Sequence, residues 1–91
     1  MALVKVDNYY ITDLKFFLLK KYAKELGGSE YHLIKNRFSE KTSFMTESAK
    51  NLFTTSCIRK CIKLYSYGKK NNKEDIMRKY AVAILSIIDS M

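Results

Sequence analysis

The segment at residues 19–38, LKKYAKELGGSEYHLIKNRF, contains the point where one helical pattern stops and another begins. Ala23 lies four residues before Gly27. Leu26 comes immediately before that glycine, and Leu33 follows it by six residues. This spacing is typical of two short helices that cross at a steep angle around a tight turn. We therefore expect the rest of the chain to be organised around this pair of helices.

The composition indicates a single helical domain. The chain has 91 residues, which is the size of one domain, and 47% of them are hydrophobic, which is enough to build a core without a metal or a disulfide. Proline is absent and glycine occurs only three times, so the chain lacks the frequent turn residues that an all-β fold requires. We predict an all-α domain spanning residues 1–91, built as a small bundle of four helices, or five if the third one breaks.

The first two predicted helices flank the glycine pair. A first helix begins near residue 9, and its buried stripe consists of Ile11, Leu14, Leu18, Tyr22 and Leu26. Gly27 is expected to end it in the left-handed conformation, and Ser29 is expected to cap the second helix. The inward positions of that second helix are Tyr31, Leu33, Ile34 and Phe38. Residues 2–6 are expected to form a short strand or an extended arm.

The second half of the chain predicts two further helices. Thr46 is expected to cap a third helix, whose apolar face rotates at residues 54–56, TTS. The rotation predicts a kink or a break there, and the alternative is one continuous helix buried on two sides. Gly68 is expected to end this helix, residues 69–73 to form an exposed basic loop, and Asn72 to cap a last helix.

The last predicted helix is the most apolar part of the chain. Its stripe consists of Ile76, Met77, Tyr80, Ile84, Ile87 and Ile88. A helix this apolar either lies at the centre of the core or is covered by a second copy of the chain. We expect it to form the core together with the first helix, and a homodimer through this helix is a further prediction.

The run AKELG at residues 23–27, together with Leu33, resembles the helix-turn-helix of the phage Cro and repressor families. This resemblance implies that the second helix enters the major groove of double-stranded DNA. The residues it places over base edges are Ser29, Glu30, His32 and Asn36, and those it places on phosphates are Lys20, Lys24, Lys35 and Arg37. The alternative is an ordinary helical hairpin with a Gly-Gly connector.

The net charge of +8 is unevenly distributed, because no acidic residue occurs between Glu47 and Glu74. A region of one sign creates a positive surface field that suits nucleic acid, an anionic membrane surface or an acidic protein, although it is also consistent with a merely solvated face. The residues expected to supply much of the affinity for nucleic acid are Arg59, Lys60, Lys63, Lys69 and Lys70.

The sequence offers no constellation of catalytic residues. His32 is the only histidine, no glycine-rich phosphate loop is present, and Cys57 and Cys61 are expected to act as small hydrophobic side chains. We therefore predict neither an enzyme nor a metal or other cofactor. The leading prediction is a small DNA-binding protein or transcriptional regulator.

Two alternatives remain open. One is a helical protein-interaction factor, such as an inhibitor, immunity-type or anti-defence protein of a phage or plasmid, which would place its basic face on an acidic partner. The other is a helix at a membrane surface. The longest purely apolar run, residues 81–85, is far shorter than the roughly 18–20 residues needed to cross a bilayer. With no recognisable signal peptide either, the expected location is the cytoplasm.

Overall fold

The computed structural model describes residues 5–6 and 9–90, and four α-helices account for most of them. The elements in chain order are β1 (Lys5–Val6), β2 (Tyr9–Tyr10), α1 (Ile11–Tyr22), the 3₁₀ helix η1 (Ala23–Glu25), α2 (Ser29–Thr42), α3 (Glu47–Lys70) and α4 (Glu74–Asp89). The prediction of an all-α fold is confirmed. The strand expected within residues 2–6 is present at β1, which pairs antiparallel with β2; residues 2–4 lie outside the described part.

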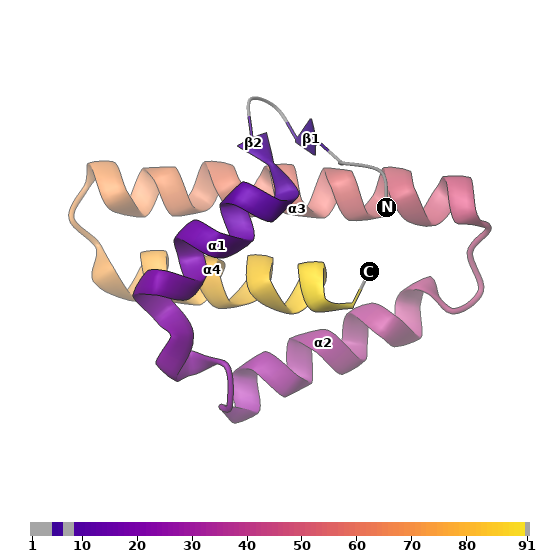
Figure 1. The fold of residues 1–91 in the computed structure, drawn as a ribbon, viewed down its shortest axis with the longest axis horizontal. Coiled ribbons are helices and arrows are strands. Elements are labelled where there is room, and N and C mark those ends of the chain that lie inside the picture. Colours follow the sequence, from indigo (N-terminus) through magenta and orange to yellow (C-terminus); the bar gives the residue numbers. More distant parts are fainter. Residues whose placement is uncertain (1–4, 7–8, 91) are drawn as a thin grey trace.

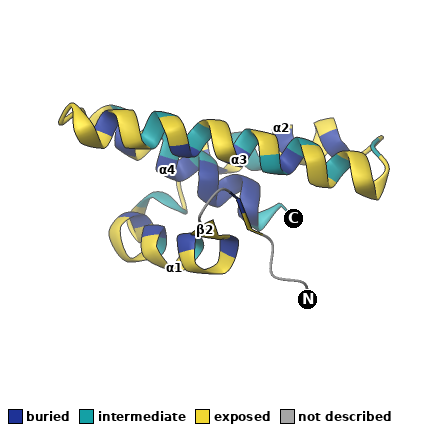
Figure 2. Ribbon diagram, turned by 90° about the horizontal axis from the view of Figure 1, so that it is seen from above, coloured by how far each residue is buried: buried dark blue, intermediate teal, exposed yellow. Residues whose placement is uncertain are grey.

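The helix α4 is the centre of the fold. It lies antiparallel beside α3, while α1 crosses this hairpin obliquely and α2 runs along the edge of α4 opposite α3 (Figure 1). The predicted placement of the last helix in the core is confirmed, since the C-terminal half of α4 is almost continuously buried (Figure 2). Its buried residues are Met77, Ala81, Val82, Ile84, Leu85, Ser86, Ile87 and Ile88. The apolar surface that suggested a homodimer is therefore covered within one chain.

The link between α1 and α2 differs from the prediction. Ile11, Leu14, Leu18 and Tyr22 of the predicted stripe are buried as expected, but the helix ends at Tyr22 and continues as a 3₁₀ turn. Leu26, the last residue of that stripe, follows the turn and is half-buried. The amide of Gly28 donates to the carbonyl of Glu25 across this turn (3.2 Å), so the chain reverses without a left-handed residue. Gly27 accordingly has no positive φ, and the expectation for it was wrong.

The start and the inward face of α2 also need correction. Gly28, with an extended backbone, occupies the N-cap position, so Ser29 is the first residue of the helix rather than its cap. Tyr31 and Phe38 are buried as predicted, but Leu33 is 51% exposed. Leu33 lies five residues before Phe38, which turns it roughly 140° away from the face that packs on α4.

The third helix does not break at residues 54–56. The helix α3 is continuous, so the alternative of one helix buried on two sides is correct. Its apolar face rotates because its two halves contact different helices. Phe53 stacks on Phe38 of α2 with 5.6 Å between ring centroids, whereas Tyr65 meets Tyr22 of α1 edge to face at 6.3 Å. Thr46 caps the helix as predicted, accepting a hydrogen bond from the amide of Ala49 (3.2 Å).

The end of α3 lies two residues beyond the expected stop. Gly68 is buried inside the helix, at a close approach to α4: a Cβ there would lie 2.9 Å from the side chain of Ile76. Lys69 and Lys70 thus belong to the helix and not to a loop. Asn72 makes the turn with a φ of 54°, and the N-cap residue of α4 is Lys73, without a side-chain cap, so the capping role expected of Asn72 was wrong.

A polar contact joins α1 and α2 to the end of α4. The hydroxyl of Tyr31 donates a hydrogen bond to the carboxylate of Asp89, and the ammonium of Lys15 lies 2.9 Å from the other carboxylate oxygen. Burial and the neighbouring carboxylate raise the pKa of Tyr31 to about 12. Burial alone would raise the pKa of Asp89, but the bonds from Tyr31 and Lys15 outweigh it and hold that pKa below its usual value.

Candidate nucleic-acid interface

The C-terminal half of α3 carries a cluster of exposed cationic side chains. We call this cluster the basic face, and it consists of Arg59, Lys60, Lys63, Lys69 and Lys70. Arg59, Lys60, Lys63 and Lys70 are exposed because they are turned away from the side of the helix, with Ile58 and Ile62, that is buried in the core. Lys69 lies on the same side as Ile62 and is exposed in the last turn of the helix. The structure thus brings together on one rigid element the basic residues that the sequence singled out in this region.

The basic face also carries an aromatic side chain. Tyr67 is 49% exposed, and the ammonium of Lys73 lies 5.6 Å from the centre of its ring. The lysines in the last turn of α3 are favourably placed against the negative end of the helix dipole. The nearest acidic residues in sequence, Glu74 and Asp75, lie in the first turn of α4, where Asp75 pairs with Arg78 (3.6 Å). No acidic side chain interrupts the basic face within α3 itself.

The base-contacting candidates of α2 are only partly brought together. All four side chains are exposed. At the helical repeat, Ser29, His32 and Asn36 share the side of α2 that faces away from Phe38. Glu30 lies on a different side of the helix. The exposed surface of α2 therefore presents three of the four predicted residues in one direction.

The phosphate-contacting candidates near α2 are divided between elements. Lys20 lies on α1 with its ammonium 5.0 Å from the ring centre of Phe16, and Lys24 is exposed in η1. Lys35 is half-buried with its ammonium over the ring of Tyr31 (5.8 Å), while Arg37 is exposed on another side of α2. These four residues do not form one cationic surface comparable to the basic face.

The turn at residues 23–28 lacks two local features that the helix-turn-helix resemblance implied. Ala23 is exposed, whereas the family uses a small residue at a point of helix contact. Gly27 does not adopt the left-handed conformation. The helices on either side of the turn pack on α4 more than on each other.

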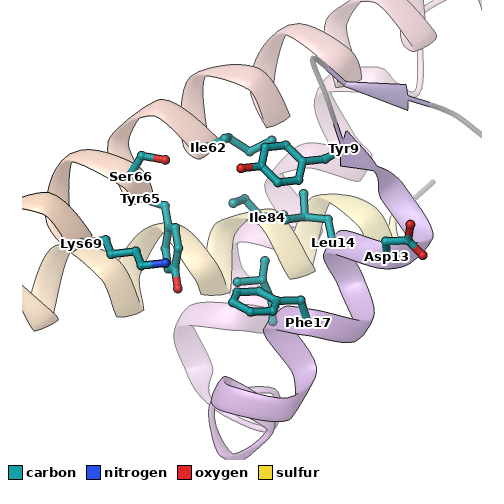
Figure 3. Close-up of a pocket in the computed structure, with 10 residues that line it drawn as sticks. Tyr9, Asp13, Leu14, Phe17, Ile62, Tyr65, Ser66, Lys69 and Ile84 are labelled. Atoms are coloured by element: carbon teal, nitrogen blue, oxygen red, sulfur yellow. The ribbon is translucent and has the colours of Figure 1, made fainter.

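A pocket between α1 and α3 was not found from the sequence. It has a volume of about 310 Å³, and we call it the aromatic groove (Figure 3). Its lining consists of Tyr9, Asp13, Leu14, Phe17, Leu18, Ile62, Tyr65, Ser66, Lys69 and Ile84. These residues come from β2, α1, α3 and α4, so no local pattern connects them. The available signal was Phe17, a large apolar residue outside the stripe of the first helix, which is 53% exposed.

A second, wider groove of about 770 Å³ lies along the contact between α2 and the N-terminal half of α3, and we call it the α2–α3 groove. Its lining includes Phe38, Phe53 and Phe44, the last of which is 95% exposed. Arg37, Glu40 and Lys41 also line it. This groove therefore combines an apolar interior with two basic residues and one acidic residue.

Cys57 and Cys61 are free and half-buried, one helical turn apart. Burial raises the pKa of both thiols, that of Cys61 to about 11, so both are protonated at neutral pH and poorly nucleophilic. Among the residues described, no group of three or more His, Cys, Asp or Glu side chains is placed to hold a metal ion. Within the same residues, no helix is both long enough and apolar enough to cross a membrane.

Comparisons with models of protein families, with curated proteins and with solved structures found no match to this chain.

Proposed function

We propose that the protein binds nucleic acid through the basic face of α3, without catalysing a reaction. The observation that carries this proposal is the exposure of Arg59, Lys60, Lys63, Lys69 and Lys70 along one uninterrupted helix that contains no acidic residue after its first turn. Lysine and arginine neutralise phosphates and release bound counterions, which supplies most of the sequence-independent affinity for nucleic acids.

The dimensions of the basic face suit a phosphate backbone. Arg59 and Lys70 are separated by a rise of about 16 Å along the helix axis. A DNA duplex carries roughly ten negative charges over that length. Because the buried side of α3 packs against the core, the cationic side chains project from a fixed helix rather than from a loop.

The basic face and the exposed side of α2 are alternative binding surfaces. Figure 1 places α4 between α2 and α3, and each of these helices turns its exposed side away from α4. A straight duplex therefore could not lie on both surfaces at once. We favour the basic face because it gathers the charge in one place; the helix-turn-helix interpretation instead requires Ser29, His32 and Asn36 to read the major groove.

Two variants with equal changes in charge separate these surfaces. The first is Lys60→Ala/Lys63→Ala/Lys70→Ala on α3, and the second is Lys20→Ala/Lys24→Ala/Arg37→Ala on α1, η1 and α2. Each removes three positive charges, which lowers the formal net charge from +8 to +5. Fluorescence anisotropy with labelled single-stranded and duplex oligonucleotides, at about 50 and about 200 mM salt, measures their affinity.

The wild type should bind at low salt and weaken steeply as salt rises. The α3 variant should lose at least about tenfold in affinity and about three units of the log–log salt slope, while the second variant keeps both. The opposite result would assign binding to the helix-turn-helix surface. Absence of salt-sensitive binding by the wild type at low salt would contradict a nucleic-acid function altogether.

The α2–α3 groove favours a second candidate function, the binding of an acidic protein. Phe44 is 95% exposed beside an apolar groove that Arg37, Glu40 and Lys41 also line. Such a surface suits an amphipathic helix whose acidic residues face Arg37 and Lys41. This candidate predicts a stoichiometric complex with a protein and no duplex binding by the isolated chain. Titration calorimetry with such a partner should show that Phe44→Ser abolishes the complex, while the α3 lysine variant retains it.

A further inference from the structure

We propose that the aromatic groove between α1 and α3 holds an unpaired base of a single-stranded nucleic acid whose phosphates lie on the basic face. This inference rests on the proposed function and specifies it, because it names the form of nucleic acid and the place of one base.

The shape and lining of the groove suit a planar aromatic ligand. Figure 3 shows Tyr9 and Phe17 projecting from β2 and α1, Tyr65 projecting from α3, and Leu14 and Ile84 between them. The volume of about 310 Å³ lies at the lower end of the range of small-ligand sites, roughly 300–1,000 Å³. Stacking on aromatic side chains is the usual way in which proteins hold the bases of single strands.

The exposure of these rings gives a second reason for a ligand. Tyr9 is 48% and Phe17 is 53% exposed, so both rings leave apolar surface in contact with water along the groove. A base inserted into the groove would cover part of this surface, which is favourable in proportion to the apolar area covered. The Tyr65 hydroxyl is protonated at neutral pH, as an ordinary tyrosine hydroxyl is, and burial raises its pKa further, to about 12.

The groove is continuous with the basic face. Lys69 belongs to both, and Lys63 and Lys70 each lie about one helical turn from Ser66, which also lines the groove. A strand whose phosphates contact these lysines can therefore turn one base across Lys69 into the groove. The Ser66 hydroxyl also lines this side, where it can hydrogen-bond to the edge of a base.

A base within a duplex could not occupy this site. Paired bases expose only their edges in the grooves of DNA, and their faces are covered by neighbouring pairs. Inserting a base between α1 and α3 requires its removal from the stack, which costs least in a strand that is already unpaired. The expected preference is therefore for single strands over duplexes.

Neighbouring aromatic residues provide matched controls. Phe17 lines the groove and Phe16 does not, although both lie on α1 and are exposed (53% and 64%). Tyr9 and Tyr10 form the same kind of pair in β2, with Tyr9 in the lining. The side chains to be replaced are half exposed, so Phe17→Ala and Phe16→Ala should both leave the fold intact, as thermal melting by circular dichroism will show.

The experiment measures the affinity of these variants for three ligands by fluorescence anisotropy: a single strand of about 15 nucleotides, an abasic strand of the same length and a blunt duplex. Phe17→Ala should weaken binding of the single strand about tenfold, and Phe16→Ala should not change it. Neither variant should change binding of the abasic strand or the duplex. Phe17→Trp should retain affinity, and Phe17→Leu should lose most of it because the stacking surface is gone.

The outcomes separate this inference from the proposed function. One outcome is that the α3 lysine variant loses binding, while Phe17→Ala and Tyr9→Ala bind single strands as tightly as their controls Phe16→Ala and Tyr10→Ala. In that case the groove inference is wrong, and the basic face remains the binding surface. Full affinity in Phe17→Leu would also overturn the inference, since it would indicate a general apolar contact instead of base stacking. If the wild type binds none of the three ligands at low salt, the proposed function itself fails.

Discussion

The helices α3 and α4 form one antiparallel hairpin, yet they differ in what their side chains contact. Nearly every side chain from Ala81 to Ile88 on α4 is buried, whereas α3 exposes one side from Leu52 to Lys70. In this part of α4 the identity of almost every residue is constrained by packing. In α3 only one side is so constrained, which leaves the other free to carry charge.

This difference predicts that the residues that determine stability and those that determine binding lie mainly in different helices. Substitutions in the buried part of α4 should change the free energy of unfolding, while substitutions on the exposed side of α3 should change binding and leave that free energy nearly unaltered. The following predictions test this separation, beginning with the largest expected effect.

The largest contrast is expected between two leucines. Leu85 of α4 is fully buried and Leu52 of α3 is 75% exposed. Leu85→Ala should lower the free energy of unfolding by about 2–5 kcal/mol, because it removes buried methyl groups and leaves a cavity. Leu52→Ala should change it by less than about 0.5 kcal/mol. Urea denaturation followed by circular dichroism measures both, and equal losses would contradict the division between the helices.

A smaller contrast is expected between two glycines. An alanine at Gly68 would place its Cβ 2.9 Å from Ile76 and force the hairpin apart, whereas the space around Gly27 is open. Gly68→Ala should cost about 1–3 kcal/mol in spite of the better helix propensity of alanine. Gly27→Ala should be neutral or stabilise by about 0.4–1 kcal/mol through the unfolded chain.

Thermal melting tests the glycine pair. For a domain of this size, each kcal/mol shifts Tm by roughly 4–8 °C. Gly68→Ala should therefore melt several degrees below the wild type and Gly27→Ala at or above it. A Gly68→Ala protein as stable as the wild type would show that α3 and α4 can separate without loss of packing.

The smallest effect is expected at Asp89, where α4 contacts both α1 and α2. Asp89→Asn should cost about 1–2 kcal/mol at pH 7 by weakening the contacts with Tyr31 and Lys15. The folded-state pKa of Asp89 lies below its unfolded value of about 3.9, so its ionised form stabilises the fold above that pH, and the contribution is lost as pH falls through the folded-state pKa. Urea denaturation at pH 7 and at about pH 3 should show the difference between wild type and variant shrinking in acid. A difference that grew in acid would contradict the lowered pKa.

The features predicted correctly from the sequence depend on near neighbours in the chain. The buried stripe of α1 follows from helical periodicity, and the cap by Thr46 needs only a hydroxyl three residues before an amide. The errors arose where distant elements decide the outcome. Gly68 resembles a helix terminator, but the approach of Ile76 explains its small side chain, and the rotation of the α3 face reflects contacts with two different helices.

In the candidate site, too, the features set by residues close in sequence were predicted, and those set by distant elements were not. The residues of the basic face were predicted because they are close in sequence and their charge is visible without a fold. The aromatic groove was not, because Tyr9, Phe17 and Tyr65 meet only when β2, α1 and α3 are assembled on α4. Local spacing could not anticipate that arrangement.

The central place of α4 has a consequence for the order of folding. Residues 74–89 follow the other helices in the chain, so α1, α2 and α3 leave the ribosome before the helix on which they pack. The contacts that close the core link segments far apart in sequence, which slows folding relative to a bundle with local contacts. Until α4 emerges, the nascent chain has apolar helical faces without the helix on which they pack.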